Sequence, residues 1–167
     1  MKTAKEMYNY CKGKKFGQGQ SEAWALKHFS IIEKSLADDE EALTCFIGLH
    51  NYMSLIKHDS NYVYAITKKR IVMAQKKLIG EALKTVFHDN VHDIKFQPGS
   101  IFGLIVLDTI KETIHIALGK KQAAHIYNEI HDVLNGLKHK EKLSVLATAV
   151  SAAEPKKYKE LLETGTS

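Results

Sequence analysis

The densest group of chemically active side chains is a run of basic residues between positions 68 and 77. Five positive charges fall there with no acidic residue among them: Lys68, Lys69, Arg70, Lys76 and Lys77. Clustered ammonium and guanidinium groups attract phosphate and other anions. The run is therefore a candidate contact for an anionic lipid surface. It is equally typical of a solvated hairpin whose charges keep edge strands soluble, and we favour that second interpretation.

The nine histidines suggest a metal hypothesis that their spacing does not support. His88 and His92 straddle an expected turn, with no third ligand at a recognisable spacing. His125 and Glu129 share one face of an expected helix, but His131 lies six residues from His125 and points elsewhere. The HExxH spacing of zinc proteases is absent. The sequence therefore predicts neither a metal site nor a cofactor.

Nucleophilic catalysis would need a cysteine or serine beside a histidine, and the sequence offers Cys45 with His50. Both fall in one expected strand, five residues apart, so their side chains should point to opposite faces. The glycines between residues 13 and 19 do not form a phosphate-binding loop. We expect no catalytic residue and no enzyme activity. Cys11 and Cys45 are too few and too far apart in the sequence for a disulfide framework or a cysteine-built zinc site.

Length and composition indicate one soluble domain with extensions. The chain has 167 residues, is 44% hydrophobic and carries a formal net charge of +5. Only one of its basic residues is an arginine, which disfavours specific readout of nucleic acid. No apolar run is long enough for a signal peptide or a membrane span. We therefore expect a cytoplasmic protein.

Residues 1–41 carry a helical period and form a predicted N-terminal arm. Leu26, Phe29, Ile32 and Leu36 recur at spacings of three and four, which places them on one helix face. Ahead of this helix, a glycine-rich turn separates it from a shorter helix at the start of the chain.

From residue 42 the hydrophobic period changes to two and predicts seven short strands. They are expected at residues 43–51, 62–67, 70–75, 82–87, 91–96, 102–108 and 113–118. A tight turn at residues 68 and 69 joins the second strand to the third. Pro98 and Gly99 have the chemistry of a type II turn, in which Gly supplies a positive φ.

A helix is predicted directly after the last strand, at residues 120–136. Its apolar stripe comprises Ala123, Ile126, Tyr127, Ile130, Val133, Leu134 and Leu137. Gly136 is well placed to end this helix. Because the stripe must be buried and the strands offer the only large surface, we expect the helix to cap them. Strands and capping helix together predict one domain over residues 42–137.

The remaining residues, 138–167, form a predicted C-terminal helical tail. Leu143, Leu146 and Val150 suggest one amphipathic helix, and Pro155 suits the first position of a second. Helices this short are marginal alone in water. Each should pack on the domain, on the N-terminal arm or on another chain.

Seven antiparallel strands followed by one capping helix is the order of a pleckstrin-homology-like (PH-like) barrel. The stretches FIGLHNYMSLIKHDSNYVYAITKKRIVMAQKKLIGEALKTV at 46–86 and IFGLIVLDTIKETIHI at 101–116 resemble the bacterial PH-like domains of the YokE-like group. The resemblance covers roughly residues 42–137. It implies a mainly β fold: a barrel of seven antiparallel strands with a C-terminal capping helix, flanked by N- and C-terminal helical extensions.

For function, the resemblance implies a non-enzymatic binding or assembly module with no shared ligand site. Eukaryotic lipid-binding relatives use a lysine, a spacer, a second basic residue, one further residue and an arginine. Lys57, Lys68 and Arg70 are similar to that pattern on paper, although Lys57 falls in a loop and the register differs. Lys57 thus joins the basic run as a sixth candidate contact for an anion or lipid.

The expected partner is a second copy of the chain or another protein. In a self-associated form, the apolar residues of one N-terminal arm would pack against those of a C-terminal tail: Trp24, Leu26, Phe29 and Ile32 against Leu143, Leu146 and Val150. The alternative is weak peripheral binding to an anionic membrane surface through the hairpin at residues 68–77.

Overall fold

The computed structural model describes residues 1–163, with side chains described through residue 152. The helices are α1 (Ala4–Lys14), α2 (Glu22–Ser35) and α3 (Lys120–Glu163), with a short 3₁₀ turn η1 (His88–Asn90). The strands are β1 (Ala42–Leu49), β2 (Asn61–Thr67), β3 (Arg70–Lys76), β4 (Glu81–Phe87), β5 (Val91–Gln97), β6 (Phe102–Thr109) and β7 (Thr113–Gly119). The chain forms two compact units, Met1–His131 and Asp132–Ser167, and α3 begins in the first and continues in the second.

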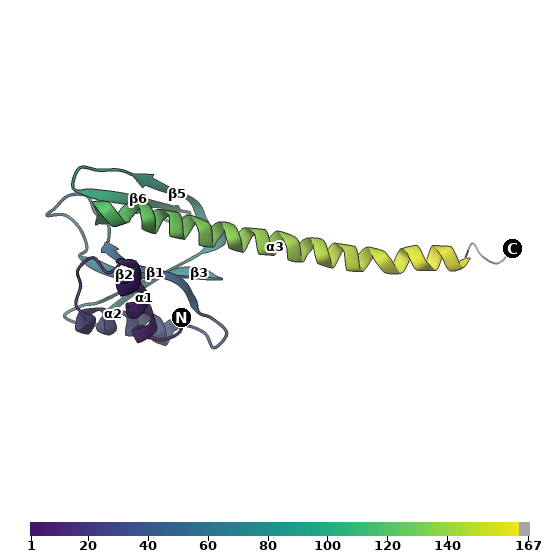
Figure 1. Ribbon diagram of the computed structural model, residues 1–167, viewed down its shortest axis with the longest axis horizontal. Helices are drawn as coiled ribbons and strands as arrows, with labels where there is room; N and C mark the ends of the chain where they lie inside the picture. Colours follow the sequence, from purple (N-terminus) through teal and green to yellow (C-terminus); the bar gives the residue numbers. More distant parts are fainter. Residues whose placement is uncertain (164–167) are drawn as a thin grey trace. The chain divides into compact units, whose positions relative to one another are not determined.

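The strands form one antiparallel sheet in the order β4-β3-β2-β1-β7-β6-β5. The β1–β7 junction is held by a single paired position, Leu49 with Ala117, so the sheet bends there into two halves. Figure 1 shows β5 and β6 on one side of the first unit and β1, β2 and β3 on the other. Seven antiparallel strands and a mainly β fold are confirmed, with strand ends within two residues of the predicted ones.

The interior of the barrel is filled by side chains from both halves of the sheet and by the start of α3. Phe46 of β1 stacks on Tyr64 of β2, with ring centroids 4.7 Å apart. Ala123, Ile126 and Ile130 of α3 are buried. The first turns of α3 therefore cap the barrel, as the sequence predicted.

Close packing of α3 on β6 leaves no room for a side chain at position 103. A Cβ atom added at Gly103 would lie 2.3 Å from the Cβ of Ala123 and 3.0 Å from a ring carbon of Phe96. We expect Gly103→Ala to lower the free energy of unfolding by about 1–3 kcal/mol, because helix or strand must move to admit the methyl group. Urea denaturation measures this change.

Gly13 in α1 provides the matched control. A Cβ atom there meets nothing within 4 Å. Gly13→Ala should therefore raise the stability by about 0.5 kcal/mol, since alanine loses less backbone freedom in a helix than glycine does. A Gly103→Ala protein as stable as the unmodified chain would contradict this account of the packing.

The N-terminal helices α1 and α2 lie on the outer face of β1–β3 (Figure 1). Strands β1, β2 and β3 are consequently buried along almost their whole length, whereas β4 and β5 alternate in burial. Phe29 and Ile32 of α2 are fully buried within their own chain. These two side chains are therefore not available for pairing with a second copy. The separate folding of residues 42–137 stays a prediction.

Three local predictions about turns and helix ends are wrong. Gly99 does not adopt the positive φ that a type II turn needs; among the glycines described, Gly19 and Gly80 do. Gly136 does not end a helix, and Pro155 does not begin one, since both lie inside α3. One glycine costs only about 1 kcal/mol in a helix interior, and helix-favouring residues flank it on both sides.

Candidate functional site

The structure divides the six predicted anion contacts between the two ends of β3. Lys68 and Lys69 form the β2–β3 turn and Arg70 begins β3. Lys76 ends β3 at the other end, and Lys77 follows it in the β3–β4 loop. Lys57 lies in the β1–β2 loop, which leaves the sheet at that same end. The run 68–77 is thus not one surface.

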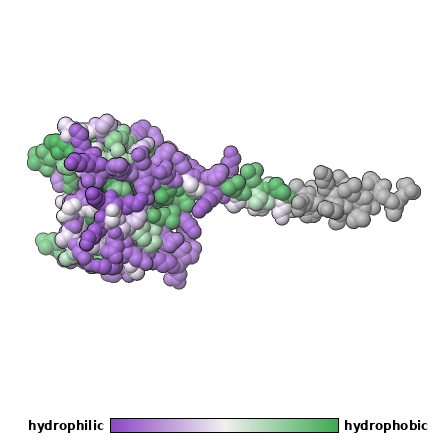
Figure 2. Space-filling model, viewed as in Figure 1, coloured by the Kyte–Doolittle hydropathy of each residue, from purple (hydrophilic) through white to green (hydrophobic). Residues whose placement is uncertain are grey.

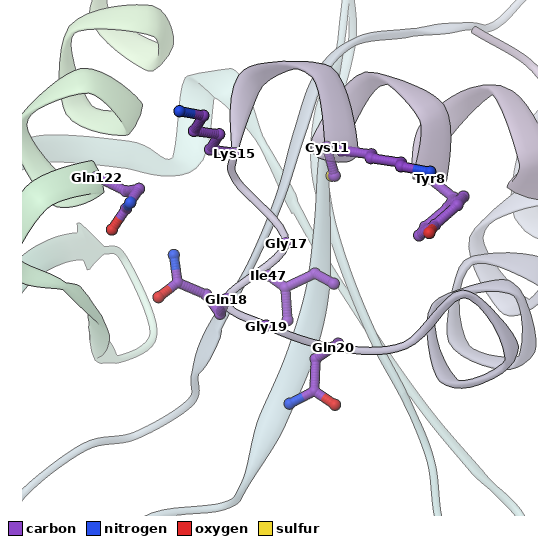
Figure 3. A pocket seen from close by; sticks show the side chains of 10 residues that line it. Tyr8, Cys11, Lys15, Gly17, Gln18, Gly19, Gln20, Ile47 and Gln122 are labelled. Carbon is purple, nitrogen blue, oxygen red and sulfur yellow. The ribbon is translucent and has the colours of Figure 1, made fainter.

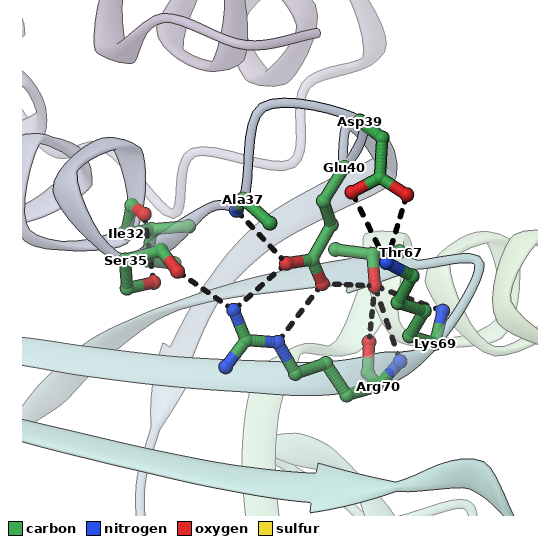
Figure 4. A network of polar contacts seen from close by, with 8 residues as sticks. All are labelled: Ile32, Ser35, Ala37, Asp39, Glu40, Thr67, Lys69 and Arg70. Atoms are coloured by element: carbon green, nitrogen blue, oxygen red, sulfur yellow. Dashed lines mark hydrogen bonds and ion pairs between the residues drawn. The ribbon is translucent and has the colours of Figure 1, made fainter.

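Arg70 holds a buried carboxylate (Figure 4). Its Nε and Nη2 atoms donate to the two carboxylate oxygens of Glu40 at 2.9 and 2.8 Å, and Nη2 also donates to the carbonyl of Ser35 at 2.7 Å. The Thr67 hydroxyl donates to the same carboxylate at 2.8 Å, and Glu40 is only 3% exposed. Hydrogen bonds from Arg70 lower the pKa of Glu40 from 4.5 to about 2.

This network joins the end of α2 to the β2–β3 turn and commits the only guanidinium of the chain to a structural role. Other lysines of the run also have acidic partners. Lys69 pairs with Asp39 at 3.0 Å and Lys76 with Glu81 at 3.1 Å. Three lysines of the predicted set have no carboxylate within ion-pair distance among the described residues: Lys57, Lys68 and Lys77. Their charges are therefore not neutralised by an acidic partner.

Two loops expose aliphatic side chains beside two of these lysines, Lys57 and Lys77. Ile56 in the β1–β2 loop is 97% exposed, and in the β3–β4 loop Leu78 is fully exposed and Ile79 is 89% exposed. We call Ile56, Lys57, Lys77, Leu78 and Ile79 the loop-tip surface. Sequence reasoning missed its apolar part. The available signal was a repeated motif, a Leu-Ile pair beside a lysine, in LIK at 55–57 and KLI at 77–79.

The two loops are joined at their bases. The Gln75 side chain donates to the carbonyls of Asp59 and Asn61 at 2.9 and 3.2 Å, which ties the end of β3 to the end of the β1–β2 loop. Trp24, stacked on His28 with centroids 3.6 Å apart, lines an open cavity together with Leu78. Hydrophobic protrusions stand out from a hydrophilic surface at the left of the first unit in Figure 2.

A second cavity, of about 410 Å³, lies between the α1–α2 connection, β1 and the start of α3 (Figure 3). Cys11, Ile47 and Gln122 line it, together with Gln18. The Gln18 side-chain oxygen accepts a hydrogen bond from the backbone N–H of Gly119 at 2.7 Å. The wall is mixed in polarity and presents no pair of groups arranged for acid–base chemistry.

The predicted nucleophile and base do not meet. Cys45 contacts Cys11 and the carbonyl of Met7. His50 is fully buried on the other side, where its Nδ1 lies 2.8 Å from the Tyr64 hydroxyl. Burial lowers the pKa of His50 to about 4, so its imidazole is neutral near pH 7.

The histidines considered as metal ligands are also dispersed. The Nε2 of His88 lies 2.8 Å from the Thr67 carbonyl, and His92 is exposed. Glu129 accepts hydrogen bonds from Tyr10 and Lys14 on α1 rather than facing a histidine cluster. Within the described residues, no three His, Cys, Asp or Glu side chains are grouped so that they could hold a metal ion.

Comparison with known proteins bears on the barrel and not on the tail. Residues 36–132 match the family described as Bacterial PH domain. No curated protein matches the chain. The family match begins at the end of α2, includes every strand and ends within α3. Because it spans more than half of the chain, and because the sheet order and capping helix agree with it, this protein belongs to the bacterial PH domain family.

Proposed function

We propose that this PH domain is a non-catalytic binding module that docks reversibly on anionic lipid surfaces through the loop-tip surface. The observation that carries the proposal is the exposure of Ile56, Leu78 and Ile79 beside two lysines without acidic partners. Aliphatic side chains at loop tips gain free energy when they leave water, and ammonium groups beside them meet lipid phosphates.

The apolar contribution is the larger of the two. Burying an aliphatic side chain contributes about 1.5 kcal/mol or more to the binding free energy. Burial of Ile56, Leu78 and Ile79 together therefore contributes several kcal/mol. A lysine near an acidic leaflet contributes about 1 kcal/mol. Lys76 already pairs with Glu81, which leaves Lys57 and Lys77 for lipid. Binding should therefore need anionic lipid for full strength and weaken only moderately with added salt.

The position of Trp24 supports docking of the domain with the loop-tip surface facing the lipid. The ring is half-buried at the beginning of α2 and lines a cavity with Leu78 and Lys77. Tryptophan rings favour the boundary between lipid and water. No described helix is long and apolar enough to cross a membrane.

Co-sedimentation with vesicles tests this proposal. The full chain should bind vesicles that contain phosphatidylglycerol and bind phosphatidylcholine vesicles much less. Lys77→Glu should weaken binding about tenfold or more, because it replaces an attraction of about 1 kcal/mol with a repulsion. Lys68→Glu is the matched control: it also lacks an acidic partner but lies at the other end of β3, and it should leave binding nearly unchanged. Equal losses in both variants, or indifference to phosphatidylglycerol, would contradict the proposal.

Self-association through α3 is a second candidate function. Leu143, Leu146 and Val150 are exposed and recur at spacings of three and four, the spacing of a two-stranded coiled-coil seam. A helix gains stability by burying such a stripe. We propose a second copy of the chain as its partner. Light scattering should give a mass above that of the monomer for the full chain, and Leu146→Glu should return it to the monomer mass.

The remaining expectations belong to the same proposal. Residues 42–137 form the lipid-contacting domain, with residues 1–41 and 138–167 as helical extensions. We also propose membership of the YokE-like group, on the sequence resemblance at residues 46–86 and 101–116, and a cytoplasmic location. Another protein is the alternative partner of the loop-tip surface, and stable binding to a protein with no lipid binding would select it.

A further inference from the structure

Two cysteines that are far apart in the sequence meet in the core of the first unit. Cys11 lies on the buried face of α1 and Cys45 in the middle of β1, and their Sγ atoms are 3.7 Å apart. Both are free and almost fully buried. In the sequence these two cysteines are too few and too far apart for a disulfide framework. Because α1 packs against β1, the two cysteines contact each other in the folded chain.

Each thiol has a defined environment. The Cys11 Sγ donates to the carbonyl of Cys45 at 3.4 Å, and the Cys45 Sγ donates to the carbonyl of Met7 at 3.4 Å. Burial raises the pKa of the Cys45 thiol. Cys11, by contrast, lines the cavity of about 410 Å³ shown in Figure 3. Cys11 lies at the wall of this cavity and Cys45 does not, so we expect a small oxidant to meet Cys11 first.

We propose that Cys11 and Cys45 are a redox-sensitive pair that forms a disulfide between α1 and β1 when the protein meets a peroxide. The Cys11 sulfur attacks one peroxide oxygen and the O–O bond breaks. The thiol proton leaves with the departing hydroxide as water, and the product is a Cys11 sulfenic acid. The Cys45 sulfur then attacks the Cys11 sulfur. The S–O bond breaks, and the Cys45 proton leaves with the hydroxide as a second water. Two thiols and one hydrogen peroxide thus give one disulfide and two waters.

The geometry requires only a small movement. A disulfide bond is about 2.0 Å long, so the two sulfur atoms must approach by less than 2 Å from their present contact. Rotation of the two side chains, with a small shift of α1, supplies this. The bond would close a loop that contains the last residues of α1 and all of α2, and it would tie α1 to β1 on the outer face of the sheet.

Intact mass spectrometry of the full chain tests the proposal. Reduced protein is treated with hydrogen peroxide, unfolded, and alkylated with N-ethylmaleimide. The expected product has lost two hydrogens and carries no maleimide, and proteolytic peptides containing Cys11 and Cys45 are linked. The rate should not depend on protein concentration, because the bond forms within one chain.

Two variants separate the steps. Cys45→Ala keeps the first step and removes the second, so Cys11 should accumulate as a sulfenic acid that dimedone traps. Cys11→Ala should leave Cys45 largely unreacted. The oxidised full chain should also unfold at a higher temperature than the reduced chain, and dithiothreitol should reverse this increase. Complete alkylation of both cysteines after peroxide treatment, or disulfides found only between chains, would overturn the proposal.

Discussion

Arg70→Met is expected to lower the free energy of unfolding by about 3 kcal/mol, the cost of leaving a buried carboxylate without its partner. Glu40 is 3% exposed and receives both of its charged hydrogen bonds from Arg70. Methionine keeps the length of the side chain and removes the guanidinium. Urea denaturation at pH 7 measures the loss.

The control for this prediction changes both partners. Arg70→Met combined with Glu40→Met replaces the ion pair with apolar side chains, and such replacements are often neutral or better. The double variant should therefore be more stable than Arg70→Met alone. Vesicle binding of folded Arg70→Met protein should match that of the unmodified chain, because Arg70 lies outside the loop-tip surface. A stable Arg70→Met protein that no longer binds vesicles would contradict both the stabilising role of Arg70 and its position outside the lipid contact.

Acid should destabilise the domain in two steps. The pKa of His50 is lowered from 6.5 to about 4 in the folded state, so the unfolded chain binds this proton first and stability falls as pH decreases from 6.5 to 4. The pKa of Glu40 is lowered from 4.5 to about 2, so its contribution is complete above pH 4.5 and is lost as pH falls toward 2. Denaturation curves across this range should show the lower step disappear in the double variant without Glu40.

Leu78→Ser combined with Ile79→Ser is expected to weaken binding to anionic vesicles about 100-fold. Each exposed aliphatic side chain contributes about 1.5 kcal/mol when it leaves water, and two give about 3 kcal/mol. Stability should change little, because neither side chain packs on the domain. Titration with vesicles, followed by co-sedimentation, gives the partition coefficient.

Phe87→Ser combined with Ile110→Ser is the matched control for surface hydrophobicity. Both side chains are more than half exposed, but they lie near the η1 turn and not in the two loops. This pair should leave the partition coefficient within about twofold. Equal losses in the two double variants would mean that general surface hydrophobicity, rather than the loop-tip surface, accounts for binding.

Much of the barrel could be predicted because its signals are local. Alternation along the strands and the stripe of Ala123, Ile126 and Ile130 each specify an element without reference to the rest of the chain. The position of the N-terminal helices could not be predicted in this way. Strands β1–β3 are buried on both faces, yet a short apolar run does not reveal what covers its second face.

The candidate site was harder to predict than the fold. Whether a charged side chain is available to a ligand depends on its partners in the folded chain. Lys68, Lys76 and Arg70 look equivalent in the sequence. In the folded chain one is free, one pairs with Glu81 and one holds Glu40. Residue type likewise predicts that Leu78 is a core side chain, whereas the β3–β4 turn places it in solvent. Exposure and pairing are properties of the tertiary structure.

Insertion of the β3–β4 loop into lipid is the most direct test of the proposed function. Leu78→Cys can be labelled with an environment-sensitive fluorophore, because Cys11 and Cys45 are buried. On mixing with vesicles containing phosphatidylglycerol, the emission should shift to the blue, and brominated lipids should quench it. The same label at Thr85→Cys, on the outer face of β4, should not respond. An unchanged spectrum at position 78 with vesicles that bind the protein, or equal responses at both positions, would contradict docking through the loop tips.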